Sequence, residues 1–247
     1  MKPPDDVRPY LYAHYVAQSA TASGYHPNAL PEYLGDALYG RHLASVDRRA
    51  PVIEIGTGAG HFLAYLRQKG FEHLSGVDLS EELVAQAQAQ GLAVTQGDGI
   101  CYLADQPDAS CGAVVAVDVV EHLTKSELLA FFKESLRVLQ PGGVLLIQTV
   151  NGQGLFPGQI AYGDLTHETI LNPGSLGRTL TTIGFTDLSF HESGPLGRTK
   201  MDSLRRLAWR MVKRMLNFLR WIEARKRQDV WTENMICCAH KAGPGPA

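Results

Sequence analysis

Residues 52–62 read Val-Ile-Glu-Ile-Gly-Thr-Gly-Ala-Gly-His-Phe, an apolar strand pattern that runs directly into three glycines with G-x-G-x-G spacing. A helical pattern follows, with apolar residues at Phe62, Leu63 and Leu66 and a stop at Gly70. Because glycine has no Cβ, such a turn can pass within van der Waals distance of a ligand. The segment therefore predicts a ligand-binding turn between a buried strand and a helix.

The chemistry of the ligand is indicated by two positions in this turn. A dinucleotide-binding turn has G-x-G-x-x-G spacing, and its third glycine would fall on His61. Glu54 stands two residues before the first glycine, where a carboxylate would repel a pyrophosphate but favour a ligand that carries an ammonium and a sulfonium group. The turn therefore indicates S-adenosylmethionine (SAM). The candidate contacts are Glu54, Gly56, Thr57, Gly58 and Gly60.

Three more acidic residues follow expected strands. Asp78 lies about twenty residues beyond the glycines, where an acid can accept hydrogen bonds from both ribose hydroxyls. Asp98 can accept the adenine amino group while Ile100 packs on the ring, and Asp118 ends the apolar run 113–117. Each acid alone would be interpreted as a helix cap or a turn residue, but four acids at successive strand ends indicate one site. The further candidate cofactor contacts are Asp78, Leu79, Asp98, Gly99, Ile100 and Asp118.

Residues 45–190 resemble the class I (Rossmann-like) SAM-dependent methyltransferases. The matching motifs are E-I-G-T-G-A-G, G-V-D-L-S, Q-G-D-G-I, V-D-V-V-E-H-L and L-R-V-L-Q-P-G-G-V-L-L-I-Q-T-V-N. The resemblance implies a doubly wound α/β fold with a seven-stranded, mostly parallel sheet whose last strand is antiparallel. It also implies that Gly56, Gly58 and Gly60 approach the methionine moiety, that Asp78 holds the ribose, and that Asp98 and Ile100 bind the adenine. Glu54 and Thr57 are mild departures, since many members have Asp and Cys there.

The resemblance divides the chain into an N-terminal helical cap, residues 1–45, and a methyltransferase domain, residues 46–247. The cap is rich in Tyr and His, and Leu34, Leu38 and Leu43 fall at helical spacing. Similar enzymes close such helices over the substrate. The alternative interpretation is an ordinary helix that covers one face of the sheet.

The composition is typical of a soluble protein, with 45% hydrophobic and 19% charged residues among 247. No apolar run approaches the length that spans a bilayer, and the first residues lack the apolar core of a signal peptide. The four cysteines have no metal-ligand spacing, and the adjacent Cys237 and Cys238 are expected to point to opposite faces of a strand. We therefore expect reduced thiols, no metal site and a cytoplasmic location.

Residues 200–227 concentrate positive charge. They contain ten Lys or Arg against two acids, so this segment carries +8 and the rest of the chain −10. An acidic body argues against nucleic acid as a partner. On a helix, apolar residues such as Leu207 and Met211 fill about half of the circumference, with Trp209 and Trp221 near the boundaries. This predicts a helical insert that contacts an anionic membrane, at its inner face, or a lipid-linked substrate. The alternatives are a helix packed on the core, a homodimer contact, and an anionic partner such as a nucleotide-linked substrate.

The reaction needs an acceptor aligned with the methyl group and, for a hydroxyl acceptor, a base that removes a proton. Two histidines are candidates: His122, which follows the Asp118 strand, and His167, which lies in the long glycine-bearing loop 151–172. We favour His167 as the base, with Asp164 or Glu168 as the carboxylate that orients it. The alternative is that these rings only fix the loop or pack on the donor.

Residues 148–241 show a narrower resemblance to methyltransferases found with cell-surface polysaccharide assembly. The matching features are D-L-T-H-E-T, N-P-G-S-L-G-R-T-L and the basic W-R-M-V-K-R-M-L segment. This resemblance implies a saccharide acceptor, lipid-linked or nucleotide-linked. One alternative is a small aromatic, quinone or polyketide acceptor. The other is a non-catalytic scaffold subunit, against which the intact glycine turn and the four acids argue.

Overall fold

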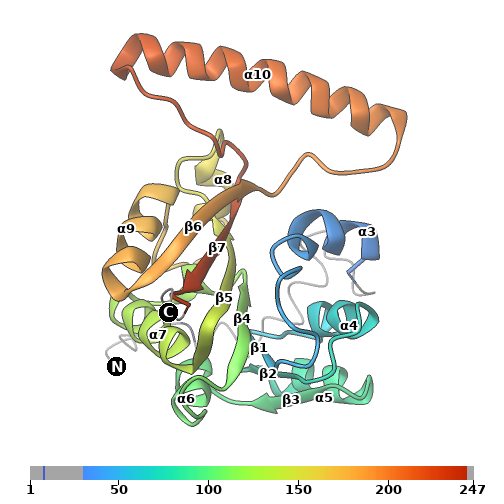
Figure 1. Ribbon diagram of the computed structural model, residues 1–247. Coiled ribbons are helices and arrows are strands. Elements are labelled where there is room, and N and C mark those ends of the chain that lie inside the picture. The colour runs from blue at the N-terminus through green and yellow to red at the C-terminus, as the bar shows by residue number, and fades with distance from the viewer. Residues whose placement is uncertain (1–7, 9–29, 244–247) are drawn as a thin grey trace, which may run out of the picture.

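The computed structural model describes Arg8 and residues 30–243 and contains one seven-stranded sheet (Figure 1). Strand β7 is antiparallel to both of its neighbours, whereas the pairs formed among β1 to β5 are parallel. This confirms the predicted doubly wound topology with an antiparallel last strand. The strand order is β3 (Ala93–Gln96), β2 (Leu74–Asp78), β1 (Val52–Ile55), β4 (Cys111–Val117), β5 (Leu139–Val150), β7 (Asn234–Lys241) and β6 (Phe185–Glu192).

Helices cover both faces of the sheet because alternate strand residues point to opposite sides. On one face, Val114 and Ala116 belong to a core cluster with side chains of α6 (Gly99–Ala104), α7 (Lys125–Val138) and α9 (Pro173–Ile183). On the other face, Ala113 and Val115 pack with residues of the π-helix η1 (Asp36–Gly40) and α4 (His61–Gln68). The remaining helices are α3 (Glu32–Gly35), α5 (Glu81–Ala89), η2 (Val120–His122), α8 (Pro157–Ala161) and α10 (Lys200–Ala224).

Local capping fixes where several helices begin. Ser80 accepts a hydrogen bond from the Leu83 amide at the start of α5. Thr124 and Glu127 form the capping box expected for α7, in which each side chain bonds to the other's backbone amide. Asp98 caps α6, so β3 ends at Gln96 and Ile100 lies in the first turn of the helix.

The segment Pro141–Gly143 lies within β5 and does not separate a helix from a strand. Helix α7 ends at Val138, and β5 already begins at Leu139. The β4–β5 pairing shifts register between Cys111 and Ala113, so this segment is accommodated as an irregularity within the strand. Proline can occupy such a position because the local ladder hydrogen bonds are already disrupted.

All four cysteines are free thiols. Cys237 and Cys238 lie next to each other on β7, and they belong to the core clusters of opposite sheet faces. Burial raises the pKa of the Cys238 thiol to about 11, so it stays protonated at neutral pH. These two cysteines therefore fill the core on both sides of the strand, as predicted.

The described part of the predicted N-terminal cap lies against α4. The Tyr39 ring meets the Phe62 ring edge-on at 5.0 Å, and the Tyr65 hydroxyl donates to Asp36 at 2.9 Å. Arg8 forms an ion pair with Glu127 at 2.9 Å and donates to the His122 carbonyl oxygen. The other residues of the cap up to 29 lie outside the described residues.

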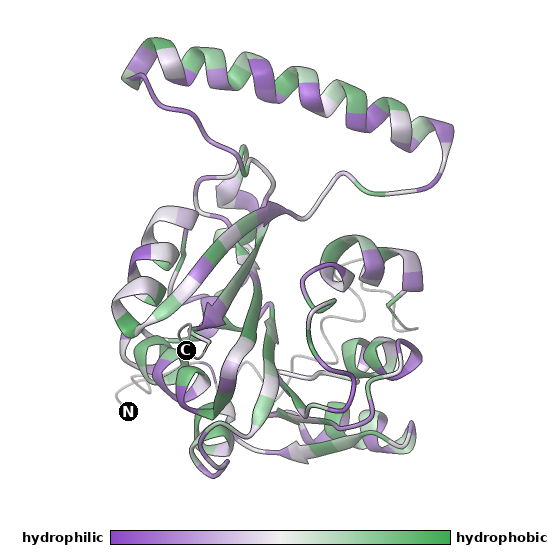
Figure 2. Cartoon of the chain, viewed as in Figure 1, coloured by the Kyte–Doolittle hydropathy of each residue, from purple (hydrophilic) through white to green (hydrophobic). Residues whose placement is uncertain are grey.

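Helix α10 extends along one end of the molecule, and chain segments connect both of its ends to the sheet (Figure 1). None of its 25 residues is buried. Hydrophobic and hydrophilic residues alternate along the helix in bands (Figure 2). No helix within the described residues is long and apolar enough to cross a membrane.

Candidate functional site

The glycine turn adopts a backbone that only glycine tolerates easily. Gly56, Gly58 and Gly60 have φ values of 70°, 54° and 83°, in the left-handed region. A Cβ added to Gly56 would lie 2.3 Å from Cγ2 of Val119, so the turn also packs tightly against the segment after β4. The sequence prediction of a close-approach turn between β1 and α4 is consistent with this geometry.

Glu54 lies buried beneath the turn, on β1. Its exposed fraction is 2%, and its Oε2 atom has no hydrogen-bond partner. Burial, together with the nearby Asp78 carboxyl, raises the pKa of Glu54 well above its ordinary value. An uncompensated buried acid at this position is an acceptor suited to a cationic ligand group.

Asp78, at the end of β2, braces the turn in this structure. Its Oδ2 accepts from the Gly58 amide at 2.7 Å, and its Oδ1 accepts from the Ser80 amide at 2.8 Å. A carboxylate has about four acceptor positions, so both oxygens can take a further donor. Asp78 can therefore hold the turn and still accept from ribose hydroxyls.

The expected adenine contacts lie at the next strand end. Oδ1 of Asp98 accepts from the amides of Ile100 and Cys101 at 2.9 and 2.8 Å, which makes Asp98 the N-cap of α6. Leu79, which follows β2, is 54% exposed and offers an apolar surface. Gly99 packs against Ile55, since an added Cβ would meet the Ile55 side chain at 2.4 Å.

Asp118 follows β4 and takes part in a hydrogen-bond chain that the sequence did not reveal. Its φ is 54°, and the Gln148 side-chain amide donates to both of its oxygens at 3.1 and 3.2 Å. The Tyr39 hydroxyl in turn donates to Oε1 of Gln148 at 2.8 Å. Asp118 is thus positioned by β5 and by the described part of the N-terminal cap.

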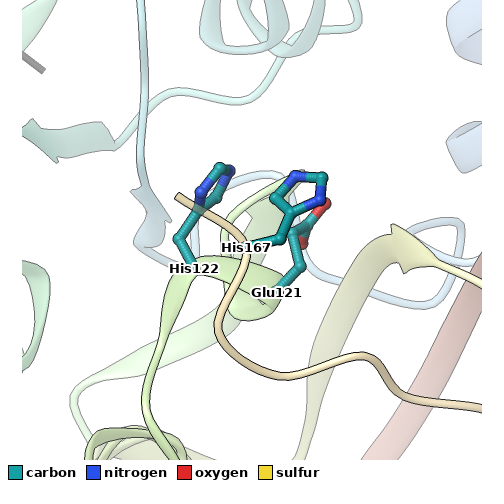
Figure 3. A group of neighbouring side chains, drawn as sticks. All are labelled: Glu121, His122 and His167. Atoms are coloured by element: carbon teal, nitrogen blue, oxygen red, sulfur yellow. The ribbon is translucent and has the colours of Figure 1, made fainter. Parts of the chain in front are cut away.

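The two candidate histidines lie side by side although they come from different segments (Figure 3). The ring centroids of His122 and His167 are 4.8 Å apart, edge to face. Glu121 completes the group, and Figure 3 shows its carboxylate beside the His167 ring. The fold therefore joins the end of η2 to the loop 151–172, whose amides at Glu168 and Thr169 donate to the Glu121 carbonyl oxygen.

Hydrogen bonds fix the tautomers of both rings. The Thr166 hydroxyl donates to Oδ1 of Asp164 at 2.6 Å, so its oxygen accepts from Nδ1–H of His122 at 2.8 Å. Nδ1 of His167 lies 3.2 Å from the Ala161 carbonyl oxygen, which can only accept. Nδ1 of His167 therefore carries a proton, and in the neutral ring Nε2 is the acceptor. Asp164 acts on His122 through Thr166, rather than orienting His167 as the sequence suggested.

Glu121 is the site residue that sequence reasoning missed. It is buried, and the Thr149 hydroxyl donates to its Oε2 at 2.8 Å. Burial, and then the charge of Asp118, raise the pKa of Glu121 to about 8. Burial and the neighbouring His167 lower the pKa of His122 to about 4. The sequence feature that could have identified Glu121 as a site residue is its position next to His122 in the V-V-E-H-L motif.

The same three residues are a group that could hold a metal ion. One ligand atom each from Glu121, His122 and His167 lies within 4.8 Å of the others. Two imidazoles and one carboxylate match the ligand preferences of several divalent transition metals. The sequence predicted no metal, and that expectation stays a prediction to be tested.

Comparison with known proteins identifies the part of the chain that contains the turn. Residues 53–147 match the family model described as "Methyltransferase domain". A "Probable S-adenosylmethionine-dependent methyltransferase" of Mycolicibacterium smegmatis is 34% identical over 134 residues, which cover 54% of this chain and 51% of that protein. Residues 53–147 thus match a methyltransferase domain, and the sheet to which they belong has the strand order of the class I fold. The cofactor of this methyltransferase domain is SAM.

A second relative and a solved structure are similar to this chain in the same way. A protein of Mycobacterium tuberculosis named "Probable S-adenosylmethionine-dependent methyltransferase" is 30% identical over 155 residues, covering 60% of this chain and 56% of that protein. The chain thus spans about half the length of the curated relatives it matches. A SAM-dependent methyltransferase from Archaeoglobus fulgidus shares the fold, with a TM-score of 0.65, 22% identity, and coverage of 85% of this chain and 94% of that one.

The residues present fit SAM. The orphaned Oε2 of buried Glu54 offers an acceptor near the turn, and the glycines of the turn lack the Cβ atoms that would obstruct a ligand. SAM carries an ammonium and a sulfonium group, and both are favoured near a carboxylate. Asp78 retains acceptor capacity for the ribose, and the exposed Leu79 can cover an apolar ring face.

Proposed function

We propose that the protein methylates a hydroxyl oxygen of a saccharide, and that His167 is the general base. The observation that carries this proposal is the tautomer of His167, whose Nδ1–H points to the Ala161 carbonyl oxygen and leaves Nε2 as a proton acceptor. A sugar hydroxyl is a poor nucleophile at neutral pH, so a positioned base is the simplest means of activation. SAM, when bound, supplies the electrophilic methyl group.

The other residues of the cluster position the base and the acceptor. The chain from Asp164 through Thr166 holds the His122 ring edge-on to the His167 ring. Glu121 lies beside both rings in a buried position. Because the pKa of Glu121 is raised to about 8, its carboxyl can hold a proton near neutral pH and donate to an acceptor hydroxyl. His167 then takes the proton that the acceptor oxygen releases.

The saccharide class rests on the narrower resemblance of residues 148–241 and on the surface of the loop 151–172. Phe156 and Tyr162 are 64% and 82% exposed there. Exposed aromatic rings suit a sugar, whose C–H face stacks on a ring while its hydroxyls form hydrogen bonds. A small aromatic, quinone or polyketide acceptor is the competing class, since such molecules stack on the same rings.

The acceptor class can be tested with radiolabelled SAM. Purified protein is incubated with separate pools of glycans, lipid-linked saccharides, nucleotide sugars and quinones, and the labelled product is isolated. Label in a saccharide as a base-stable ether supports the proposal. Label in the quinone or aromatic pool alone contradicts the substrate class. SAM binding without transfer to any pool supports the scaffold alternative.

The base can be tested separately. His167→Ala should lower kcat by about 10²–10⁴-fold and leave SAM affinity unchanged, because the ring acts on the acceptor proton only. His122→Ala should have a smaller effect, since His122 acts by packing against His167. If His122→Ala is inactive and His167→Ala is not, the base is His122.

A further inference from the structure

We propose that α10 is a membrane-docking helix, which lies flat on an anionic lipid surface with its apolar face in the headgroup region. This inference goes beyond methyl transfer and does not depend on it. It rests on the direction in which the two faces of α10 point.

The polar face of α10 is directed toward the body of the protein. Lys213 forms an ion pair with Glu192 at 2.9 Å, and the Trp209 indole donates to the same carboxylate at 3.2 Å. One turn further on, Asn217 exchanges two hydrogen bonds with the Gln228 backbone. Residues 209, 213 and 217 are spaced by four, so they share one face of the helix. That face is held to the protein by hydrogen bonds and one ion pair.

The apolar face lies on the opposite side and is open to solvent. Its large side chains are 48–64% exposed, and within residues 30–243 none of them is buried by another element. A surface helix of a soluble protein usually directs its apolar face toward the core, whereas α10 directs its apolar face away from the protein. The alternative interpretation, a helix whose apolar half packs on the core, therefore does not hold for the described residues. The exposed face comprises Met201, Leu204, Leu207, Met211, Met215, Phe218, Leu219, Trp221 and Ile222.

Charge complementarity indicates what covers this face. Arg210 and Arg214 are exposed and lie beside the apolar row, and Lys200, Arg205 and Arg225 add further exposed cations along the helix. Cations that flank an apolar stripe meet lipid phosphates when the stripe enters the headgroup boundary. A second copy of the same surface would bring these arginines against each other. The 25 residues give a helix about 37 Å long, which lies along a bilayer surface rather than across it.

Docking through α10 would also orient the candidate site. The segment after α10 is bonded to the loop 151–172, since Gln228 donates to the Gln153 carbonyl oxygen at 2.6 Å and the Leu155 amide donates to Trp231 at 3.0 Å. The loop carries the exposed Leu165 and Tyr162. The helix and the loop are thus coupled, and a lipid-bound acceptor would reach the loop from the same surface.

The test is co-sedimentation of the full chain with vesicles that contain 30% phosphatidylglycerol in phosphatidylcholine. We expect binding that weakens as salt rises and that is absent with pure phosphatidylcholine. Trp emission should shift to the blue as Trp221, 53% exposed, leaves water. The double variant R210Q/R214Q should bind about 30-fold more weakly, at about 1 kcal/mol for each cation. These two arginines are chosen because Arg206 and Lys213 hold the helix to the protein.

The matched control is R49Q/K133Q, which removes two exposed cations from other elements and should bind like the wild type. The apolar contribution is tested with M211S/F218S, which should bind more weakly at every salt concentration. Equal binding by R210Q/R214Q and its control would overturn the proposal, and so would a flat vesicle titration at low salt. A dimer in light scattering that M211S/F218S converts to monomer, without vesicle binding, would assign the face to a second copy instead.

Discussion

The Thr149 hydroxyl donates to Oε2 of Glu121 at 2.8 Å, which connects strand β5 to the buried carboxyl beside the two histidines. A neutral hydroxyl does not compensate a buried negative charge. The pKa of Glu121 is accordingly raised to about 8, because burial and Asp118 both disfavour ionisation. The stability of the fold should therefore depend on pH through this residue.

Glu121→Gln should be stabilising at alkaline pH relative to the wild type. Below the ordinary pKa of 4.5 the carboxyl is protonated in both the folded and the unfolded chain. Between 4.5 and about 8 only the unfolded chain ionises, so the wild type loses stability as pH rises through this window. The side-chain amide of the Glu121→Gln variant cannot ionise, so the variant keeps its stability in this window. The difference in unfolding free energy between variant and wild type should therefore grow by roughly 2–5 kcal/mol as the pH rises. Urea unfolding at pH 5 and pH 8 measures it, with Glu168→Gln as a control for loss of one charge. A constant difference would contradict the burial argument.

Gly56→Ala should disrupt the turn by more than the backbone strain of an alanine with positive φ. Gly56 and Gly91 have nearly equal φ values of 70° and 72°, so alanine at either position costs about 1–2 kcal/mol of backbone strain. At Gly56 the new Cβ clashes with Cγ2 of Val119 at 2.3 Å, whereas at Gly91 it only touches the Arg67 guanidinium at 3.9 Å. We expect Gly91→Ala to lose stability but to retain SAM binding, and Gly56→Ala to lose both. Equal SAM affinity in the two variants would mean that the turn does not approach the cofactor.

Thr166→Val should reduce turnover without changing SAM affinity. The variant keeps the shape of the side chain but removes the hydroxyl that links Asp164 to Nδ1 of His122. We expect kcat to fall roughly 10- to 100-fold, because small errors in positioning are costly. Thr166→Ser should restore most of the rate, and Thr182→Val removes a comparable hydroxyl on the exposed part of α9 as a control. A loss in Thr166→Ser as large as in Thr166→Val would assign the residue a packing role.

Removal of divalent cations should leave the activity intact. His167 has a ring nitrogen that can accept a proton directly, so the proposed mechanism needs no ion. Turnover is measured after dialysis against EDTA and again after each of Mg²⁺, Mn²⁺ and Zn²⁺ is added. Loss of activity that one of these ions restores would mean that Glu121, His122 and His167 are metal ligands. His167 would then be a ligand instead of a base.

The sequence could place the candidate cofactor residues at one edge of the sheet because they lie at or near the ends of neighbouring strands. Glu54 lies in β1, Asp78 ends β2 and Asp98 follows β3, and a parallel sheet brings such strand ends to one edge. The acceptor half depends on contacts that no local pattern encodes. Glu121 meets His167 only because the loop after β5 folds back and donates two amides to the Glu121 carbonyl oxygen.

The orientation of α10 was likewise not available from its sequence. The amphipathic pattern predicts one apolar face but not the side of the helix to which the protein attaches. That side is set by Glu192 on β6 and by Gln228 after the helix, which bind Lys213 and Asn217. Nothing in the local sequence around Glu192 or Gln228 indicates that these residues contact the helix, because only the tertiary structure brings them to it.

Both the cofactor site and the proposed methyl transfer require that SAM binds at the turn between β1 and α4. Calorimetric titration of the full chain with SAM and with S-adenosylhomocysteine measures this directly. We predict micromolar affinity for the wild type and a loss of roughly 1.5–3 kcal/mol in Asp78→Ala, which removes acceptors for the ribose hydroxyls. Wild-type protein that releases no heat with either compound, or an Asp78→Ala variant that binds equally well, would contradict the assignment of this turn as the cofactor site.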